Sequence, residues 1–398
     1  MKRYPKIILS AAVIVCCLFA FAYVSAKELT PRKDDLYNQI ELFAAAIGVI
    51  RSEYVDEVNS KDLIYGAMRG MLSSLDSHSQ FMDPEEYNEM KVETEGRFGG
   101  IGIELTMKDN MPTVITPIED TPAFKAGLKP NDKLIKIDGK STQDLALDDV
   151  VKLLRGDSGT TVLLTVLREQ EKRFIDFSII RSIIMIKSIK EASVLENKIG
   201  YIKLIEFQEN TPKDFIKAFK GLEAKGIDGL ILDLRNNPGG LLDVSIKVAQ
   251  VVLPAGETIV STKGRAKNQD AVYKADYKKP VLEIPLIVLV NEGSASASEI
   301  VAAAIKDNKR GIIVGTKTFG KGSVQTVIPL GDGSALRLTT AKYFTPSGQA
   351  IHNEGIAPDI LVNNPQQKEE QKEKEEKPYD RQLDTAVSLM KCIKMIKK

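Results

Sequence analysis

The sequence predicts a multidomain α/β protein, in which an α/β core carries an inserted small β-domain and is flanked by helical N- and C-terminal segments. Residues 197–360 alternate apolar strand-like runs with amphipathic helices, which is the pattern of parallel βα units. Residues 97–184 instead form short β-runs that are broken by glycine and turn residues. The chain has 398 residues, enough for two or three domains of roughly 100–200 residues each.

The N-terminus predicts export. Lys2, Arg3 and Lys6 precede an uncharged run at 7–26, which ends in the small residues of 24–26. A run of about 20 apolar residues can span a bilayer, so residues 1–26 are either a signal peptide or an uncleaved membrane anchor. We therefore expect the remaining chain to work outside the cytoplasm, in the periplasm or cell envelope, either secreted or attached to the membrane.

The charge balance and the histidine count exclude several classes of partner. With 55 basic and 54 acidic side chains, the net charge of +1 gives no electrostatic reason to bind nucleic acid. Two histidines nearly exclude a His-rich metal site and leave little room for a Ser-His-Asp apparatus. We expect no nucleic-acid partner and no metal site.

Residues 27–95 are predicted to be helical. Apolar residues recur at helical spacing within 36–50 and again within 64–72. Asp83 and Pro84 mark the start of a further helix, because aspartate is a preferred N-cap and proline suits the first helical position.

Three short stretches follow one another at 98–102, at 122–123 with 126–128, and at 132–139. In their order and spacing they resemble a PDZ domain of the bacterial type, which would span residues 96–184. In that fold a glycine-rich turn, here Gly99, Gly100, Ile101 and Gly102, offers backbone N–H groups to the terminal carboxylate of a peptide, and the next strand pairs with the peptide. The alternative is a small β-domain whose glycines only permit turns.

Residues 185–364 form the predicted α/β core. Its unbroken apolar strands at 229–234 and 286–290 are of the type that is buried in a parallel sheet. Each strand is followed by a loop, at 236–240 and at 291–293, and then by a helix. Because ligands bind at the carboxyl ends of parallel strands, we expect these loops to carry the function.

Residues 365–398 are predicted to be a charged linker and a last helix. The stretch 366–377 consists almost entirely of Gln, Glu and Lys, which is typical of a solvated linker. Residues 380–398 place their apolar side chains on one face of a helix. This helix either packs in a homodimer or docks on its own domain.

Three serines stand where a nucleophile would be exposed. Ser294, Ser296 and Ser298 follow a buried strand and open a helix, whose first N–H groups can stabilise an oxyanion. Their spacing does not choose among them, and the run around Ser294 lacks the second glycine of a G-x-S-x-G nucleophile elbow. The alternative is a helix start of small residues in which serine only caps.

A serine nucleophile needs a base, and the sequence offers His78, His352 or a lysine. Lys321 lies in a glycine-lined stretch between two apolar runs. Burial there would lower its pKa from the usual value of about 10.4, so that the neutral amine can accept a proton. The alternative is a solvated surface charge.

The same stretch also matches part of a phosphate loop. Residues 315–322 fit G-x-x-x-x-G-K, but Gly322 stands where a P-loop carries its Mg²⁺-binding hydroxyl. A phosphate loop leads into a helix, whereas residues 323–329 alternate like a strand. Nucleotide binding is therefore disfavoured.

The motifs at 294–299 and 318–322, together with the PDZ-like insert and the loop after residue 233, resemble the carboxy-terminal processing (tail-specific) proteases. The resemblance covers about residues 35–362 and implies an α/β protease core of crotonase-like ββα texture. It implies Ser296 as nucleophile, Lys321 as base and Gln325 as the residue that orients the lysine.

The same resemblance implies roles for other residues. It places the oxyanion donors at the N–H groups of Gly239 and Ala297. Asp307 and the motifs at 76–79 and 355–359 are interpreted as structural, so that His78 is a packing residue and not a base.

The function that the resemblance implies is a serine endopeptidase that works without a metal or cofactor. Its partners would be protein or peptide substrates with flexible, apolar C-termini, which the PDZ domain captures before cleavage nearby. In this family the PDZ domain can gate the active site, and Arg155 at the end of the 147–154 helix is placed to sense a carboxylate or to hold the gate. A solvated helix-end cation is the alternative for Arg155, and a PDZ-type binding or scaffold protein with an inactive protease core is the alternative function.

Overall fold

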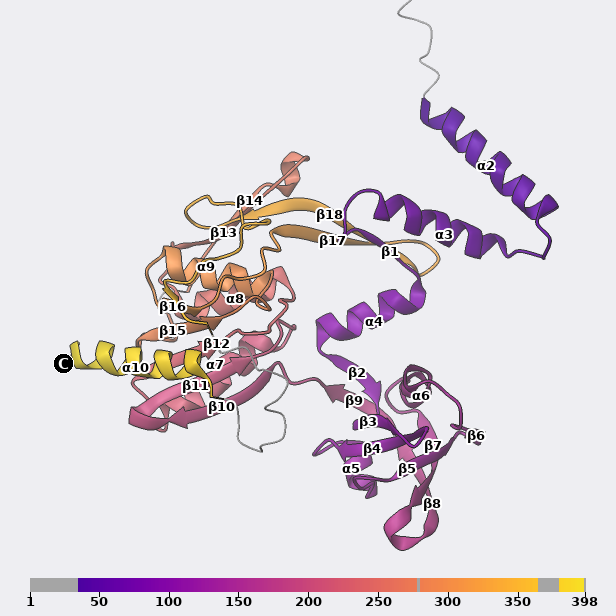
Figure 1. The fold of residues 1–398 in the computed structure, drawn as a ribbon, viewed down its shortest axis with the longest axis horizontal. Coiled ribbons are helices and arrows are strands. Elements are labelled where there is room, and N and C mark those ends of the chain that lie inside the picture. Colours follow the sequence, from indigo (N-terminus) through magenta and orange to yellow (C-terminus); the bar gives the residue numbers. More distant parts are fainter. Residues whose placement is uncertain (1–34, 278–279, 364–378, 397–398) are drawn as a thin grey trace, which may run out of the picture. The chain divides into compact units, whose positions relative to one another are not determined.

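The computed structural model describes residues 35–277, 280–363 and 379–396 (Figure 1). The segment 1–26, with its predicted signal peptide or anchor, and the predicted linker at 366–377 lie outside these residues. No helix within the described ranges is long and apolar enough to cross a membrane. The described residues up to Leu75 and those from Asp76 onward form two compact units.

The first unit contains the two helices that the apolar spacing predicts, α2 (Asp35–Glu53) and α3 (Ser60–Ser73). Helix α3 begins after Asn59, whose side chain accepts the N–H of Lys61 at 2.9 Å and so satisfies one of the free donors of the first turn.

The second unit opens with a short strand, β1 (Gln80–Met82), and helix α4 (Pro84–Glu95). The predicted cap is confirmed: Asp83 accepts the N–H of Glu86 at 3.0 Å, and the Glu86 side chain accepts the N–H of Asp83 at 2.8 Å. The helix ends at Gly96, whose φ of 66° suits glycine.

The β-domain is a twisted antiparallel sheet in the order β3-β4-β5-β7-β8, with β6 paired to β5, so that β3 lies at a sheet edge. A two-stranded ribbon, β2 with β9, joins the ends of the domain. The predicted short helices and strands are all present, and Gly127 ends α5 with a φ of 89°. The elements are β2 (Arg97–Gly100), β3 (Ile103–Lys108), β4 (Met111–Pro117), α5 (Pro122–Ala126), β5 (Lys133–Ile137), β6 (Lys140–Ser141), α6 (Leu147–Leu154), β7 (Thr161–Arg168), β8 (Arg173–Ile180) and β9 (Ser182–Met185).

The core contains a six-stranded sheet in the order β10-β11-β12-β15-β16-β19, in which only the edge strand β10 is antiparallel. A second, antiparallel sheet has the order β1-β18-β13-β14, with β17 paired to β18. The strands are β10 (Ile189–Leu195), β11 (Ile199–Leu204), β12 (Gly229–Asp233), β13 (Thr258–Gly264), β14 (Ala271–Lys274), β15 (Leu286–Val290), β16 (Ile312–Gly315), β17 (Ser323–Pro329), β18 (Ala335–Phe344) and β19 (Ile360–Leu361), and the helices are α7 (Thr211–Glu223), α8 (Leu242–Val252), α9 (Ala297–Asp307) and α10 (Arg381–Ile396).

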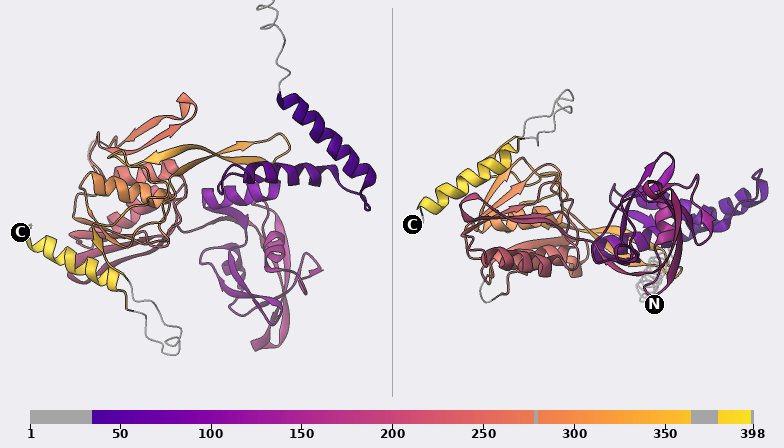
Figure 2. Two further views of the ribbon diagram at one scale, coloured as in Figure 1. Left: turned by 45° about the horizontal axis from the view of Figure 1, so that its top comes forward. Right: turned by 90° about the horizontal axis from the view of Figure 1, so that it is seen from below.

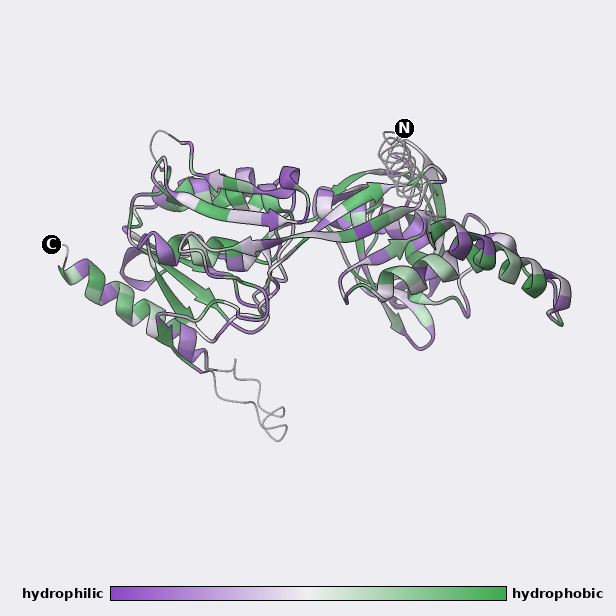
Figure 3. Ribbon diagram, turned by 90° about the horizontal axis from the view of Figure 1, so that it is seen from above, coloured by the Kyte–Doolittle hydropathy of each residue, from purple (hydrophilic) through white to green (hydrophobic). Residues whose placement is uncertain are grey.

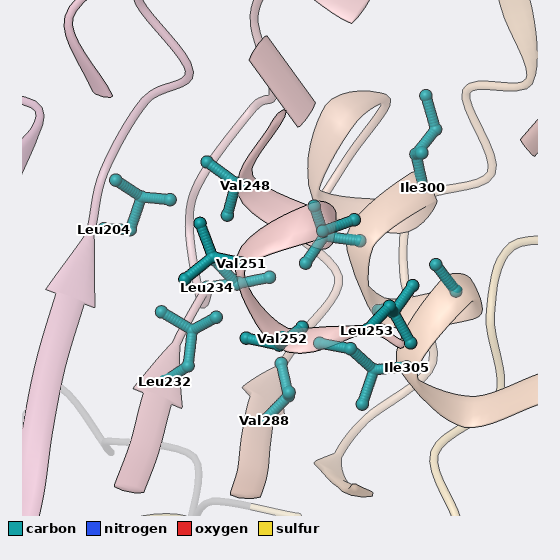
Figure 4. Close-up of a cluster of buried hydrophobic side chains, with 14 of the residues drawn as sticks. Leu204, Leu232, Leu234, Val248, Val251, Val252, Leu253, Val288, Ile300 and Ile305 are labelled. Atoms are coloured by element: carbon teal, nitrogen blue, oxygen red, sulfur yellow. The ribbon is translucent and has the colours of Figure 1, made fainter. Parts of the chain in front are cut away.

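Successive side chains of the central strands are buried on opposite faces of the six-stranded sheet. Leu232 and Val288 pack against α7, α8 and α9, whereas Ile231 and Ile287 pack against α10. Figures 1 and 2 show α8 and α9 side by side on one face, and Figure 4 shows their side chains interlocked with those of the strands. Figure 3 shows how strongly the central strands are hydrophobic. This burial on both faces explains why the strand sequences are apolar without alternation.

Helix α10 docks on its own domain, which decides between the two alternatives for the last helix. Met390 and Ala386 are fully buried against the sheet. At the start of the helix, Asp380 accepts a hydrogen bond from Arg235 at 2.7 Å, and Arg235 also bonds to Asp233 at the end of β12. The C-terminal helix is thereby bonded to the residues that lead into the 236–240 loop.

Candidate active site

Three loops meet at the carboxyl ends of β12, β15 and β16, where the sequence predicts function. Asn236 and Asn291 join the first two loops: the Asn236 N–H donates to the Asn291 side chain at 2.8 Å, and the Asn291 amide donates to the Asn236 side chain at 2.8 Å. The third loop is held by the Phe319 N–H, which donates to the carbonyl oxygen of Ser294 at 3.0 Å. The loops therefore form one rigid arrangement.

The structure distinguishes the three serines that their spacing could not separate. Ser294 and Ser298 are fully buried. Their hydroxyls donate to the backbone carbonyls of Leu234 at 2.8 Å and of Asn237 at 3.0 Å, which is a structural role. Ser296 is only half-buried, and its carbonyl oxygen accepts the N–H groups of Glu299 and Ile300 in the first turn of α9. Ser296 is therefore the serine of the three that is placed to react.

Ser296 also has an unusual backbone. Its φ of 52° and ψ of −111° lie in a region that residues with a Cβ rarely occupy, and such strain persists where the surroundings impose it, often at functional sites. It is the N-cap of α9, and the first helical residue, Ala297, has an N–H without an acceptor inside the helix. The predicted oxyanion donor Ala297 therefore directly follows Ser296 at a positive helix end.

Gly239, the other predicted oxyanion donor, lies against the same serine. A Cβ added to Gly239 would lie 2.8 Å from the Cβ of Ser296 and 3.0 Å from the nitrogen of Ala297, so only glycine permits this approach. In this structure the Gly239 N–H donates to the side chain of Asn237 at 2.9 Å. The donor stands beside Ser296 but is bonded within its own loop.

Lys321 is half-buried at the end of the third loop, and its N–H donates to Glu299 at 2.9 Å. Burial lowers the pKa of the Lys321 ammonium below its usual range, the positive charge of Arg337 lowers it further, and the charge of Glu299 opposes the change. Burial and the charge of Lys321 in turn lower the pKa of His78. The direction for Lys321 is the one that a lysine base requires.

The phosphate-loop alternative is not supported by the local structure. Residues after Lys321 form strand β17, as the alternation predicts, and no helix follows the loop. A Cβ on Gly322 would lie 2.0 Å from the backbone nitrogen of His352, so glycine is required there by packing. The position that would carry a Mg²⁺-binding hydroxyl has no room for a side chain.

The remaining predicted residues are placed as follows. Gln325 donates from its side-chain amide to Ser323 at 2.8 Å and to Thr339 at 3.4 Å, so its role in orienting Lys321 stays a prediction. Asp307 accepts the N–H of Ser347 at 2.9 Å and thereby ties the end of α9 to a neighbouring turn, a contact consistent with its structural interpretation.

The sequence reasoning gave no role to Glu299, although Ser296 and Glu299 have the S-x-x-E spacing of a capping box. That pattern could have indicated it. Glu299 is fully buried, and its carboxylate accepts the N–H of Ser296 at 2.8 Å and the N–H of Lys321 at 2.9 Å. One buried carboxylate thus binds the backbones of both predicted catalytic residues.

The PDZ-like domain has a cavity of about 190 Å³ at the predicted peptide site. Gly100, Ile101 and Gly102 line it together with Arg155, whereas Gly99 packs against Gly156, whose carbonyl oxygen would lie 2.1 Å from an added Cβ. The guanidinium of Arg155 lies over the ring of Phe98, 5.0 Å from its centre. Apolar side chains form the rest of the lining: Ile103, Leu105, Leu147, Val151 and Leu154.

The charges around Lys321 make a testable prediction for the pH profile. Because Arg337 lowers the pKa of Lys321, the substitution Arg337→Met should raise that pKa, and the acid limb of kcat/KM should move to higher pH. The measurement is kcat/KM against pH for a fluorogenic peptide. Lys342→Met, at an exposed cation of the same strand, is the control. An acid limb that stays in place in Arg337→Met would contradict the assignment of that limb to Lys321.

Comparison with known proteins identifies the family and its domains. Residues 198–362 match peptidase family S41, residues 99–179 match the PDZ domain, and residues 22–86 match the N-terminal domain of the activating protease CtpB. The carboxy-terminal-processing protease of Bartonella bacilliformis is 46% identical over 353 residues, which cover 87% of this chain and 81% of that protein. The carboxy-terminal processing protease CtpA of Bacillus subtilis is 36% identical over 373 residues, covering 92% of this chain and 78% of that protein.

Among solved structures, a photosystem II D1 C-terminal processing protease is 31% identical, with a TM-score of 0.46, and the match covers 81% of this chain and 92% of that one. The chain belongs to peptidase family S41 and is a carboxy-terminal processing serine protease with a PDZ domain.

Proposed function

We propose that this protease is exported, captures the flexible apolar C-terminus of a protein in its PDZ domain, and cleaves near that end with Ser296 as nucleophile and Lys321 as base. The observation that carries the proposal is the shared anchoring of these two residues: one buried carboxylate accepts the N–H groups of both. The oxyanion-forming loop at Gly239 lies against the same serine.

The proposed reaction follows from these positions. Burial lowers the pKa of Lys321, and in its neutral form the Lys321 amine accepts the proton of the Ser296 hydroxyl as the hydroxyl oxygen attacks the scissile carbonyl carbon. The N–H of Ala297 and, once it leaves the Asn237 side chain, the N–H of Gly239 stabilise the oxyanion. Protonated Lys321 then donates its proton to the leaving amine, and water hydrolyses the acyl-enzyme.

The PDZ domain supplies the tail specificity. Its strand β3 lies at a sheet edge, where an extended peptide can add as a further strand. The turn at Gly100–Gly102 is at one end of the cavity, where backbone N–H groups can receive a carboxylate, and the apolar lining accommodates an apolar last side chain. A charged last side chain would lose its hydration there, and the charged side chain of the lining, Arg155, is engaged by the terminal carboxylate of the tail.

Arg155 is the proposed sensor of the bound tail. The Nε atom of Arg155 is buried without a hydrogen-bond partner among the described residues, and the side chain lies at the wall of the cavity. A carboxylate that enters the site would supply that partner, and this can couple tail binding to opening of the gate. Export through residues 1–26 and assembly as a homodimer belong to the same proposal.

Tail-dependent cleavage tests this function. The full chain is incubated with a flexible protein that ends in an apolar residue and with the same protein ending in aspartate, and the products are identified by intact mass. We expect cleavage near the apolar end and a rate lower by roughly 10-fold or more for the charged end. Arg155→Ala should reduce cleavage of the apolar tail by roughly 10-fold or more, because a charge-assisted bond to the carboxylate is lost.

The matched control is Arg173→Ala in the same domain, since Arg173 is exposed and pairs only with surface groups. Equal cleavage of both tails would contradict capture by the PDZ domain. An unchanged rate in Arg155→Ala would remove Arg155 from the gate while leaving the protease assignment intact.

A further inference from the structure

Glu299 makes four hydrogen bonds that connect the predicted nucleophile to the predicted base. Its Oε2 atom accepts the N–H of Ser296 at 2.8 Å and the N–H of Lys321 at 2.9 Å. Its Oε1 atom accepts the N–H of Gly320 at 2.7 Å and the hydroxyl of Thr318 at 2.6 Å. The start of α9 and the loop before β17 therefore converge on one side chain.

The chemistry of these bonds requires a carboxylate. An ionised carboxylate only accepts, with about four lone-pair sites, and all four partners of Glu299 are donors. Burial raises the pKa of the Glu299 carboxyl, and the four hydrogen bonds oppose that rise. The negative charge also lies in the first turn of α9, where the helix dipole favours it. A fully bonded, fully buried anion is a rigid connection.

The hydrogen bonds of Glu299 hold two backbone segments, at Ser296 and at 320–321, whose conformations are already restricted. Ser296 is held at a φ of 52°, and the N–H of this strained residue is bonded to Glu299. Gly320, with a φ of 94°, turns the third loop so that its N–H and that of Lys321 face the same carboxylate. Moving either loop would break hydrogen bonds to an anion that is fully buried from solvent.

We propose that Glu299 is a positioning residue that sets the separation of the Ser296 hydroxyl and the Lys321 amine. The inference rests on the proposed roles of those two residues. Proton transfer needs the two groups within hydrogen-bond reach, and a displacement of about 1 Å can lower the rate roughly 100-fold. Glu299 itself touches neither substrate nor reacting atoms; it acts through the two backbones.

The test compares Glu299→Gln with Glu292→Gln in the full chain. Glutamine keeps the volume but turns an NH₂ group toward two donors, so that half of the connection is lost. For Glu299→Gln we expect kcat to fall roughly 100-fold with KM little changed, and labelling of Ser296 by a fluorophosphonate to slow equally. Because the Glu299 charge raises the pKa of Lys321, its loss should also move the acid limb of the pH profile to lower pH.

Glu292→Gln is the matched control, because Glu292 is exposed and its side chain accepts the Thr316 hydroxyl at 2.8 Å. Thr318→Val is the second variant, and it removes one bond from Glu299 while it keeps the charge. We expect a smaller fall in kcat for this variant, with the acid limb in place. Thr318→Val also removes the acceptor of the Ile356 N–H, so its melting temperature should fall, and its kcat is measured where the variant is fully folded. Should Glu299→Gln not fold, a fall in kcat of folded Thr318→Val carries the proposal, and wild-type kcat overturns it.

A folded Glu299→Gln protein with wild-type kcat would overturn the proposal. So would an activity loss that only follows the unfolded fraction in thermal unfolding, with the pH profile unchanged. Ser296→Ala is measured beside these variants. If that variant still cleaves and reacts with the fluorophosphonate, the proposed function itself has failed, which is a different result from failure of the Glu299 role alone.

Discussion

Replacing Ser296 by alanine is expected to lower peptide cleavage by roughly 10⁴–10⁶-fold. The reason is that Ser294 and Ser298 cannot take over: both hydroxyls are fully buried and donate to backbone carbonyls. The measurement is intact mass of a protein with an apolar tail after incubation with wild type or with the variant. Fluorophosphonate labelling, followed by mass spectrometry of the labelled peptide, identifies the reactive serine directly.

The controls are Ser294→Ala and Ser298→Ala. Ser298→Ala loses one hydrogen bond, and Ser294→Ala loses two, because the Ser294 hydroxyl also accepts the N–H of Asn291 at 3.0 Å. Each variant should unfold at a lower temperature, with a loss of about 1 kcal/mol of unfolding free energy per bond. Once folded, each should still react with the fluorophosphonate at Ser296. Cleavage by the Ser296→Ala protein at the wild-type rate would mean that another serine, or a contaminating protease, performs the reaction.

The parts of the fold that could be predicted from the sequence are those that local patterns determine. The apolar runs of β12 and β15 and the cap of α4 depend on residues that are close together in the chain, and the structure confirms them. The strand character of 323–329 is equally local, and strand β17 confirms it. Such patterns can be recognised in the sequence because each involves only residues of one helix or strand.

The parts that escaped prediction depend on partners far away in the chain. Strand β1 has three residues and exists because it pairs with β18, and no local pattern reveals that partner. The docking of α10 buries Met390 and Ala386 against strands that come much earlier in the chain, and Asp380 bonds to the equally distant Arg235. The choice among the three serines likewise depended on which hydroxyls reach carbonyls of the preceding loop, a fact of tertiary structure.

Glu299 lies between these two cases. Its local spacing to Ser296 is that of an ordinary capping box, which would predict a helix start and nothing more. Its bonds to Gly320 and Lys321 come from a loop that the fold brings to it. Because the capping box already explains the glutamate at this position, the sequence gives no reason to look for its second role, which only the structure shows.

Lys321→Met and Lys321→Arg should each lower kcat by roughly 10⁴-fold, for different reasons. Methionine fills the space but has no amine. Arginine keeps the positive charge, yet its pKa stays too high for it to accept a proton. The two variants therefore distinguish two possible roles of Lys321. If Lys321 is a neutral base, neither methionine nor arginine can replace it. If it is a fixed cation that stabilises negative charge, arginine would preserve part of the activity.

The comparison is made on kcat, on fluorophosphonate labelling of Ser296 and on thermal unfolding, with Lys317→Met as the control at an exposed lysine of the same loop. Burial and Arg337 lower the pKa of Lys321, and Glu299 opposes them. A lowered pKa makes the neutral amine easier to form. A base needs the neutral amine, whereas an electrostatic role needs the charged form. Substantial activity in Lys321→Arg, with Lys321→Met inactive, would therefore reject the base and leave an electrostatic role. Loss of labelling in both, with folding intact, would assign activation of Ser296 to the neutral Lys321 amine.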